Sequence, residues 1–509
     1  MNKDNKLNDR AVMNKDTKLP KYMTRNGPGD KDFELSLLGG KVDTSAWFQD
    51  QLTTISSETT GPWNYNPNVL EKGSIAQKAK DQEIFFCDIP FTQIFTSMGG
   101  EYAACCFGAE ADGKDGLPHN NVYNTTIKEW MEDGEYMNNI RKEMLDPNSD
   151  FEWTKKTCRR CIADEERYGR SRRTACMKIH SNLGHHWERI DKIVQMYQAT
   201  GEFKISDQRI FEVQLKVWGN ECNLDCHMCM HNNSSIRDKV AKEGVWNDQI
   251  WGPFDGRPIA SIKGDNVESM IEQTVAIAPY IDSIKIIGGE PLIMKKHYEL
   301  LDRLIEIDQA KHIMIKYQTN LTETKAGNHN IFDYIPHFRI VCMVASVDGV
   351  GQTIEYMRRR CSWDKIIKNT EYCRRYDNTT VDFNGLVSFL SVLRFYEVID
   401  FCMENPIIDT INWALLEWPT NLRVNNLPQK IKDDLIPKYE RWPDIQAALR
   451  LPEDKTNNLP GSNNEPLDIQ QTFDYLLKQD EYYIGTKWEM HLFDVFPELK
   501  EYYIKPEDR

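Results

Sequence analysis

The sequence lacks a long hydrophobic run, an excess of positive charge and an export signal. No stretch of its 509 residues approaches the roughly 18 uninterrupted apolar residues of a membrane span. Lys and Arg number 63 against 78 Asp and Glu, and a formal net charge of −15 argues against a protein that coats nucleic acid. The first residues contain no apolar segment of a secretory signal. We therefore expect a cytoplasmic protein with neither a membrane nor a nucleic acid as partner.

The sequence also lacks an even number of cysteines, which would let all of them pair in disulfides. It has 13, and in a long chain without an export signal an odd number makes a disulfide framework a poor explanation. In a reducing compartment, clustered cysteines more often hold metal. The hydrophobic fraction of 40% and the charged fraction of 28% are typical of globular proteins, and the length allows two to four domains.

Composition and pattern divide the chain into four segments. Residues 1–80 are rich in Asn, Lys, Asp and Thr and predict a mobile or irregular segment. Residues 81–180 predict a small cysteine-rich module with strands at 84–86 and 93–96, a turn at 99–100 and a helix over 125–145. Residues 207–420 predict the main domain, and residues 421–509 form an extension whose pattern indicates no role.

The main domain alternates strand and helix patterns about six times. This alternation predicts an α/β fold with a parallel sheet and right-handed crossovers. A helix around 298–305 has an apolar stripe with charges opposite. The predicted strands lie at 211–217, 283–287, 313–318, 340–345, 386–390 and 411–415.

Three cysteines directly follow the first of these strands. Cys222, Cys226 and Cys229 have the spacing C-x3-C-x2-C. Three thiolates on one loop can hold three irons of a [4Fe–4S] cluster and leave the fourth iron open to a ligand. The alternative is zinc, held by the same cysteines and a histidine such as His227 or His231.

A second motif follows the second predicted strand. It consists of Gly288, Gly289, Glu290 and Pro291. The two glycines let the backbone approach a ligand closely, and a carboxylate can accept a hydrogen bond from an ammonium group. Since loops after parallel strands meet at one face of a barrel, the two motifs predict a shared site.

On these two motifs, residues 207–420 resemble the radical S-adenosylmethionine (SAM) family. The resemblance implies a partial (βα)6 barrel, with Cys222, Cys226 and Cys229 as cluster ligands and SAM chelating the open iron. It also implies that the GGEP residues, 288–291, contact the methionyl amine. Ser346 and Arg358 would bind the cofactor carboxylate; the alternative is that Arg358 belongs to a solvated helix face.

The chemistry that the resemblance implies comes from the cofactor. A reduced cluster donates one electron to SAM, and the resulting 5′-deoxyadenosyl radical removes a hydrogen atom from the substrate. A one-electron donor such as a flavodoxin or a ferredoxin is then a required partner. For this reason we assign no catalytic side chain and look for neither paired carboxylates nor a Ser-His-Asp set.

A second set of cysteines precedes the main domain. Cys87, Cys105, Cys158 and Cys161 make four thiolates, which suit either zinc or a second [4Fe–4S] cluster. The stretch from Gly100 to Cys105 fits G-x4-C, and with the C-x2-C that follows it resembles the SPASM/twitch auxiliary-cluster module of this family, in its shorter twitch form. Cys106 can replace Cys105, and Cys176 is a further candidate ligand. The module normally follows the barrel, whereas here it precedes it.

These resemblances imply an oxygen-sensitive enzyme that modifies a peptide or protein side chain. One alternative is radical dehydrogenation of a sugar or of a nucleotide-derived small molecule. Another is a non-catalytic iron–sulfur or zinc scaffold.

Overall fold

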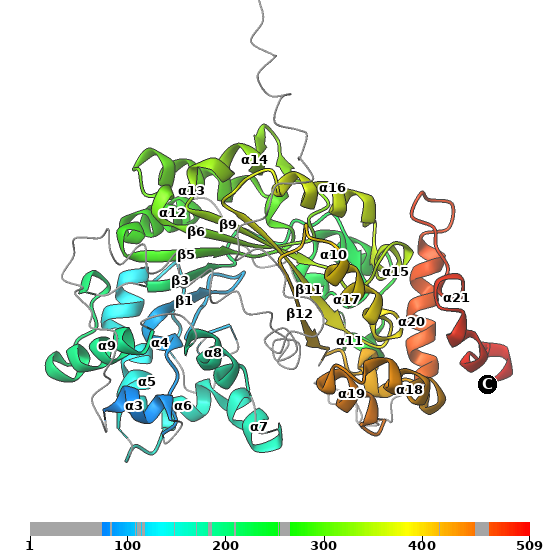
Figure 1. Ribbon diagram of the computed structural model, residues 1–509, viewed down its shortest axis with the longest axis horizontal. Coiled ribbons are helices and arrows are strands. Elements are labelled where there is room, and N and C mark those ends of the chain that lie inside the picture. Colours follow the sequence, from blue (N-terminus) through cyan, green and yellow to red (C-terminus); the bar gives the residue numbers. More distant parts are fainter. Residues whose placement is uncertain are drawn as a thin grey trace, which may run out of the picture.

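The computed structural model describes residues 74–81, 84–106, 108, 113, 118–146, 148–168, 171–181, 186–207, 210–252, 254, 265–416, 418–453 and 468–509. Most of the segment predicted to be mobile, residues 1–73, lies outside this part of the chain. The described part is built on one eight-stranded sheet, in the order β12-β11-β9-β6-β5-β3-β1-β2. Figure 1 shows the sheet curving across the molecule.

Six parallel strands of the main domain make up most of this sheet. They are rich in Ile, Val and other residues that favour extended backbone, and helices connect them. This arrangement confirms the expected α/β partial barrel. The strands are β3 (Ile210–Leu215), β5 (Ile281–Ile286), β6 (Met314–Thr319), β9 (Ile340–Ser346), β11 (Thr379–Val387) and β12 (Thr410–Leu415).

Two strands from the cysteine-rich segment extend the same sheet. β1 (Gln93–Thr96) pairs in parallel with β3, and β2 (Tyr102–Ala103) returns antiparallel to β1 through the predicted turn, where Gly100 has a φ of 90°. The amino-terminal module is therefore continuous with the barrel sheet. Two short ladders lie outside it: β4 (Asp225–Cys226) with β10 (Arg358–Arg359), and β7 (Lys325–Ala326) with β8 (His329–Asn330).

The two faces of the sheet differ in polarity. Along β11 buried and half-buried residues alternate, and Phe383 and Gly385 face the helices, where Phe383 packs near Trp363. The opposite, inner face carries a row of half-buried polar side chains near the carboxyl ends of the strands. This inner row consists of Gln318, Ser346, Asn384 and Asn412.

Helices cover the outer face of the sheet (Figure 1). α13 is typical: its buried residues, among them Leu300, Leu301 and Leu304, form the stripe that the sequence predicts. The helices of the main domain are α10 (Ser235–Lys242), α11 (Asp248–Trp251), α12 (Asp265–Ile277), α13 (Lys295–Glu306), α14 (Ile331–Tyr334), α15 (Gln352–Met357), α16 (Trp363–Cys373) and α17 (Phe395–Glu404).

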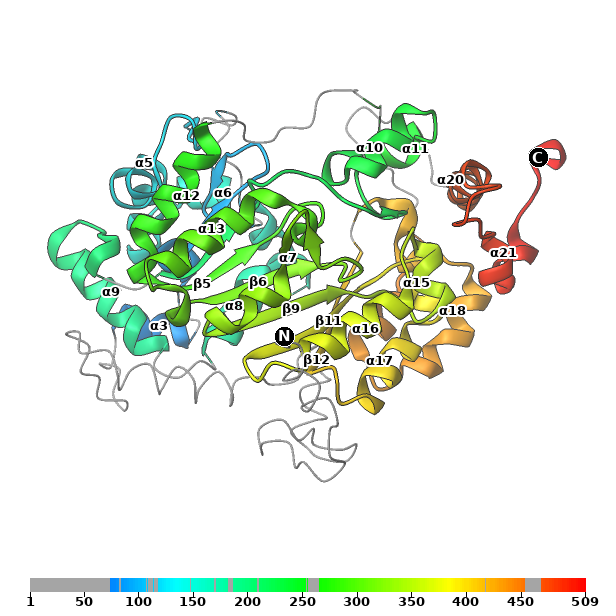
Figure 2. The same ribbon diagram turned by 90° about the horizontal axis from the view of Figure 1, so that it is seen from above.

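Further helices gather at the two ends of the sheet (Figures 1 and 2). Beside β1 lie α3 (Ile75–Lys80), α4 (Ile89–Thr92), the π-helix η1 (Glu129–Asp133), α5 (Glu135–Leu145), α6 (Glu152–Thr157), α7 (Arg159–Tyr168), α8 (Arg172–Ser181) and α9 (His186–Thr200). At the β12 end lie α18 (Gln429–Leu435), α19 (Pro443–Arg450), α20 (Ile469–Tyr482) and α21 (Leu492–Val495).

Short 3-10 helices connect many of these elements. They are η2 (Ile205–Asp207), η3 (His231–Asn233), η4 (Ala278–Tyr280), η5 (Pro291–Ile293), η6 (Ala310–His312), η7 (Ile335–His337), η8 (Ser391–Leu393), η9 (Thr420–Leu422), η10 (Val424–Asn426), η11 (Ile436–Tyr439), η12 (Pro497–Tyr502) and η13 (Pro506–Asp508).

Three local predictions need correction. Residues 84–86 form no strand, because this segment runs into α4 at the start of the module. The strand expected at 386–390 is β11 at Thr379–Val387, and residues 388–390 lie beyond its end. The helix expected over 125–145 is divided at Gly134 into the π-helix and α5.

Candidate active site

The three cysteines of the first motif lie on the loop that follows β3. Cys226 is in β4, whose ladder with β10 places Arg358 directly opposite Cys226. The Nη1 atom of Arg358 lies 3.8 Å from the Cys226 sulfur. Cys222 is half-buried, and Ser235 ties down its backbone by donating from Oγ to the Cys222 carbonyl oxygen and accepting from the Cys222 N–H. Two elements far apart in the sequence therefore hold this loop.

The three thiols influence one another electrostatically. Burial raises the pKa of Cys222 to about 12 and that of Cys229 to about 11. Burial also raises the pKa of Cys226 well above its usual range; the Arg358 cation opposes this, and the other two thiols add to it. Since metal ligation requires thiolates, metal binding at this site would release protons.

The donor set on this loop fits an iron–sulfur cluster. Its three thiols are the side chains that would hold the cluster, since each thiolate that shares a cluster binds a different iron. Among the described residues, no group of three or more His, Cys, Asp or Glu side chains forms a site for a single metal ion.

The two glycines of the second motif pack against the cysteine loop. A Cβ atom on Gly289 would lie 2.2 Å from the carbonyl oxygen of Glu221 and 2.4 Å from that of Asn220. A Cβ atom on Gly288 would lie 2.9 Å from the Gly219 carbonyl oxygen. The loop after β5 and the cysteine loop touch backbone to backbone, which only glycine permits at these positions.

Glu290 joins the same loop to the end of β6. Its side chain is fully buried, and the carboxylate accepts hydrogen bonds from the Thr319 hydroxyl at 2.6 Å and from the Asn320 backbone N–H at 2.6 Å. A third bond, from the Leu292 N–H, caps the short helix η5 that begins at Pro291. Burial raises the pKa of Glu290 to about 7, although these hydrogen bonds act to lower it.

Arg358 is held by a carboxylate as well as by the β4–β10 ladder. Its Nε donates to Asp348 Oδ2 at 2.7 Å, and Asp348 Oδ1 accepts from the Leu386 N–H at 2.7 Å. Asp348 is fully buried and only 14% of the Arg358 side chain is exposed, so Arg358 is not part of a solvated helix face. Ser346, in the inner row, accepts from Gln318 Nε2 at 3.2 Å.

The thiols of the second set also influence one another electrostatically. Burial raises the pKa of Cys87 first of all, and the nearby Asp88, Cys158 and Cys105 raise it further. Burial likewise raises the pKa of Cys158, which Cys105 and Cys161 raise further. Cys106 is exposed and accepts a hydrogen bond from Arg172 instead.

Charged residues on the inner face were missed by the sequence analysis. Lys316 on β6 pairs with Glu212 on β3 at 2.8 Å, and the Cys342 thiol on β9 lies 3.4 Å from Asp382 Oδ2 on β11. The available signal was a lysine or an aspartate inside an otherwise apolar strand, which predicts a strand facing a polar interior.

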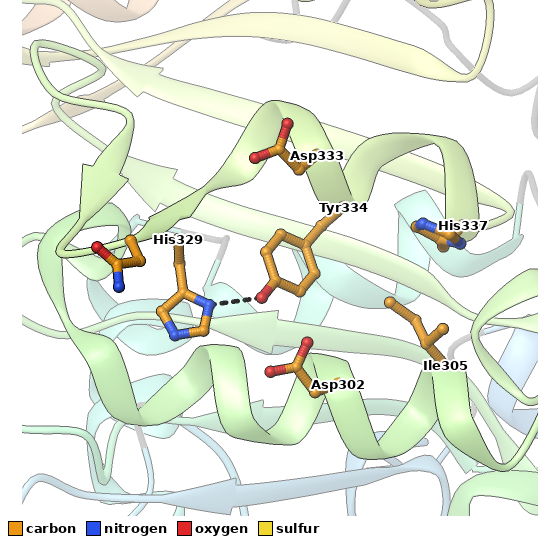
Figure 3. Close-up of a pocket in the computed structure, with 7 residues that line it drawn as sticks. Asp302, Ile305, His329, Asp333, Tyr334 and His337 are labelled. Atoms are coloured by element: carbon orange, nitrogen blue, oxygen red, sulfur yellow. Dashed lines mark hydrogen bonds between the residues drawn. The ribbon is translucent and has the colours of Figure 1, made fainter.

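A separate surface pocket contains none of the predicted site residues. It lies between α13 and α14, has a volume of about 290 Å³, and contains a hydrogen bond of 2.6 Å between His329 Nδ1 and the Tyr334 hydroxyl (Figure 3). The residues that line it are Asp302, Ile305, Asn328, His329, Asp333, Tyr334 and His337.

The comparison with protein families agrees with this geometry. The model described as Radical SAM superfamily matches residues 217–402, from the cysteine loop into α17. Residues 217–402 thus form a radical SAM domain, and by this domain the chain is an enzyme. A radical SAM domain implies a [4Fe–4S] cluster and SAM as cofactors.

Solved structures give weaker likenesses. SuiB of Streptococcus suis, solved with its precursor peptide SuiA, shares 15% identity over 62% of this chain, with a TM-score of 0.30. The chain spans 56% of the length of SuiB. TYW1, solved with a lysine-pyruvate adduct, shares 10% identity with this chain and has a TM-score of 0.27. The match covers 46% of this chain and 76% of the TYW1 chain. No curated protein matches the chain.

Among the described residues, no helix is both long enough and apolar enough to cross a bilayer.

Proposed function

We propose that the chain cleaves SAM at a [4Fe–4S] cluster held by Cys222, Cys226 and Cys229 in order to modify a peptide or protein. When bound, the cluster and SAM supply a 5′-deoxyadenosyl radical that removes a hydrogen atom from the substrate. The observation that carries the proposal is the register of β4 and β10, which sets the Arg358 cation beside the Cys226 thiol.

The residues around this loop have distinct proposed roles. Arg358, oriented by Asp348, and Ser346 bind the carboxylate of the cofactor, for which a guanidinium fork is suited. The segment 288–291 presents its backbone to the methionyl amine. Glu290 orients this segment through its bonds to the end of β6.

The second set of thiols holds an auxiliary [4Fe–4S] cluster in a twitch-like module, with Cys87, Cys105, Cys158 and Cys161 as ligands. These four are buried or half-buried whereas Cys106 is exposed, which supports this choice over Cys106. Zinc is the competing occupant, since four thiolates suit both.

The inner row supports a substrate rich in neutral hydrogen-bonding groups. Gln318, Asn384 and Asn412 are amides, which both donate and accept, as peptide groups do. Sugar hydroxyls have the same property, so a sugar or nucleotide-derived substrate is the second candidate. We prefer a peptide because the second cysteine set resembles a module of peptide-modifying enzymes. We place the reaction in the cytoplasm, served by a flavodoxin or a ferredoxin.

The test is an oxygen-free reconstitution with iron and sulfide. We expect about eight irons per chain and formation of 5′-deoxyadenosine when SAM and a reductant are added. Cys226→Ala should lose this cleavage and about half of the iron. Replacing Cys158 and Cys161 by Ala should lose the other half and leave cleavage in place.

Three results would count against parts of the proposal. Zinc in place of iron at the second site would overturn the auxiliary cluster. Cleavage of SAM by Cys226→Ala would overturn the assignment of the first cluster. Stoichiometric 5′-deoxyadenosine with a nucleotide sugar, but with no candidate peptide, would favour the second substrate class.

A further inference from the structure

Part of the carboxyl-terminal extension packs directly on the cysteine loop. This part, residues 469–492, contains α20 and the turn that leads to α21, and we name it the C-terminal clamp. In Figures 1 and 2 it lies at the end of the molecule, near α11 and α15. The sequence pattern of this segment indicates no role for it.

The first contact of the clamp is made by Tyr475. Its hydroxyl donates to the carbonyl oxygen of His227 at 2.6 Å, between the second and third cysteines of the loop. The same hydroxyl accepts a hydrogen bond from Arg237 of α10. Tyr475 is 1% exposed, so neither water nor another side chain replaces it easily.

The second contact reaches the residue before Cys226. Asp225 is fully buried, and its carboxylate accepts from Arg237 Nη1 at 3.3 Å and from the Tyr483 hydroxyl at 3.1 Å. Asp225 of the loop and Arg237 of α10 thus form a buried ion pair. Tyr475 and Tyr483 of the clamp supply additional hydrogen bonds to this pair. An ion pair away from water is stable only when such additional hydrogen bonds satisfy it.

The third contact holds the opposite strand of the ladder. Arg359, the neighbour of Arg358, is fully buried and forms an ion pair with Asp480 of α20. It also donates to the carbonyl oxygens of Trp488 at 3.1 Å and Met490 at 2.8 Å. The clamp therefore contacts both strands of the β4–β10 ladder, in which Cys226 lies opposite Arg358.

We propose that the C-terminal clamp is a positioning element for SAM: it fixes the cysteine loop relative to Arg358 and so sets how tightly the cofactor binds. This inference rests on the proposed function of the loop. It assigns Tyr475, Tyr483 and Asp480 as positioning residues, which act through the backbone of the loop. A displacement of a fraction of an ångström at the loop changes the distance between the open iron and the cofactor carboxylate site.

The experiment compares two tyrosine variants of the full-length, reconstituted enzyme. Tyr475→Phe removes the contact with the loop. The matched control is Tyr439→Phe: Tyr439 is fully buried in the same extension, donates to the Val392 carbonyl oxygen at 2.6 Å and accepts from the Tyr396 N–H at 3.2 Å. Each variant loses one buried hydroxyl that donates to a backbone carbonyl oxygen and accepts one hydrogen bond, from Arg237 at Tyr475 and from a backbone N–H at Tyr439.

The readout is the change in the electron paramagnetic resonance spectrum of the reduced cluster as SAM is added, with the melting temperature measured in parallel. We expect both variants to lose a similar amount of melting temperature. Only Tyr475→Phe should raise the apparent Kd for SAM, by about tenfold, because only this hydroxyl holds the cysteine loop in place. Tyr439→Phe should stay within about twofold of the wild-type enzyme.

Two outcomes contradict the inference in different ways. If both variants bind SAM equally well, the clamp has only a structural role, and the proposed function is unaffected. If the wild-type spectrum does not respond to SAM, the proposed function itself fails, and the inference with it. Should Tyr475→Phe not fold, Tyr483→Phe, which removes only the bond to Asp225, takes its place in the same comparison.

Discussion

At Gly289, the addition of a single methyl group would disturb the cysteine loop directly. Its missing Cβ leaves room for the carbonyl oxygens of Glu221 and Asn220, which would lie at 2.2 and 2.4 Å. Both belong to backbone that cannot move without moving Cys222. We expect Gly289→Ala to destabilise the chain by about 3 kcal/mol and to leave the first cluster incompletely loaded, as measured by iron content after oxygen-free reconstitution.

Gly201→Ala is the control for this substitution. Gly201 follows α9, has a φ of 69° and would place its Cβ in open space. The left-handed backbone alone should cost this variant about 1 kcal/mol, with a full complement of iron. Full iron in Gly289→Ala as well would show that the contact between the two loops does not position the cysteines.

Glu290 predicts a dependence of stability on pH. Burial raises its pKa from 4.5 to about 7, so between these values the folded chain holds a proton that the unfolded chain has lost. Its contribution to the free energy of unfolding therefore falls as the pH rises from about 4.5 to 7, by up to about 3 kcal/mol. Below that window the proton is bound in both states and the penalty is absent.

The measurement is urea unfolding of the metal-free chain at several pH values, compared with Glu290→Gln. The variant should be less stable at every pH, because its amide group would face backbone N–H donors. It should, however, lack the fall between pH 4.5 and 7. Parallel pH curves for the two proteins would contradict the raised pKa.

At the scale of residues, the sequence identifies the cysteine and glycine motifs. It does not fully show why these residues are needed at their positions. Spacing alone indicates that Cys222, Cys226 and Cys229 share one loop. The pattern suggested that Gly288 and Gly289 admit a ligand, whereas in the structure both approach the cysteine loop. That contact joins two segments about 70 residues apart, and no local pattern records it.

Among the elements, the β4–β10 ladder depends on Asp348, which holds Arg358 in place. Asp348→Asn removes the charge that pairs with Arg358 at 2.7 Å, and we expect a loss of about 3 kcal/mol in the free energy of unfolding. We also expect the KM for SAM to rise at least tenfold, because Arg358 is then free to leave Cys226. Urea unfolding and SAM cleavage kinetics measure the two effects.

A matched ion pair elsewhere in the barrel provides the control. Asp409 pairs with Arg374 at 2.9 Å and accepts from the Val381 N–H at 2.7 Å, much as Asp348 accepts from Leu386. Asp409→Asn should lose a comparable amount of stability and keep the KM of the wild-type enzyme. If the KM of Asp348→Asn for SAM is unchanged, the position of Arg358 does not affect cofactor binding.

The strands show how far a sequence pattern reaches at the scale of elements. Aliphatic runs place β3, β5, β6, β9 and β12 within a few residues of their observed bounds. β11 is misplaced because Asp382 and Asn384 face the polar interior and interrupt the apolar run that marks a strand. The position of β1 in the sheet could not be predicted, since its partner β3 lies more than 100 residues later.

On the scale of the whole molecule, the amino-terminal module and the barrel share one sheet. A chain that begins at residue 207 would expose the edge of β3 that β1 covers. Uncovered edges pair with other chains, so we expect this fragment to aggregate, whereas the full chain stays monodisperse in size-exclusion chromatography. A soluble fragment with a sharp melting transition would show that the barrel folds without the module. The boundaries drawn at residues 80, 180, 207 and 420 stay predictions.

The pairing of β1 with β3 also bears on how the protein is made. During synthesis β1 emerges first, and its parallel neighbour follows only after α5 to α9 have left the ribosome. Until then β1 and β2 have no sheet to join, so the nascent module waits with an open edge beside its four thiols. If the second set holds a cluster, as we propose, its thiols are available to metal on the ribosome before the cysteine loop has been made.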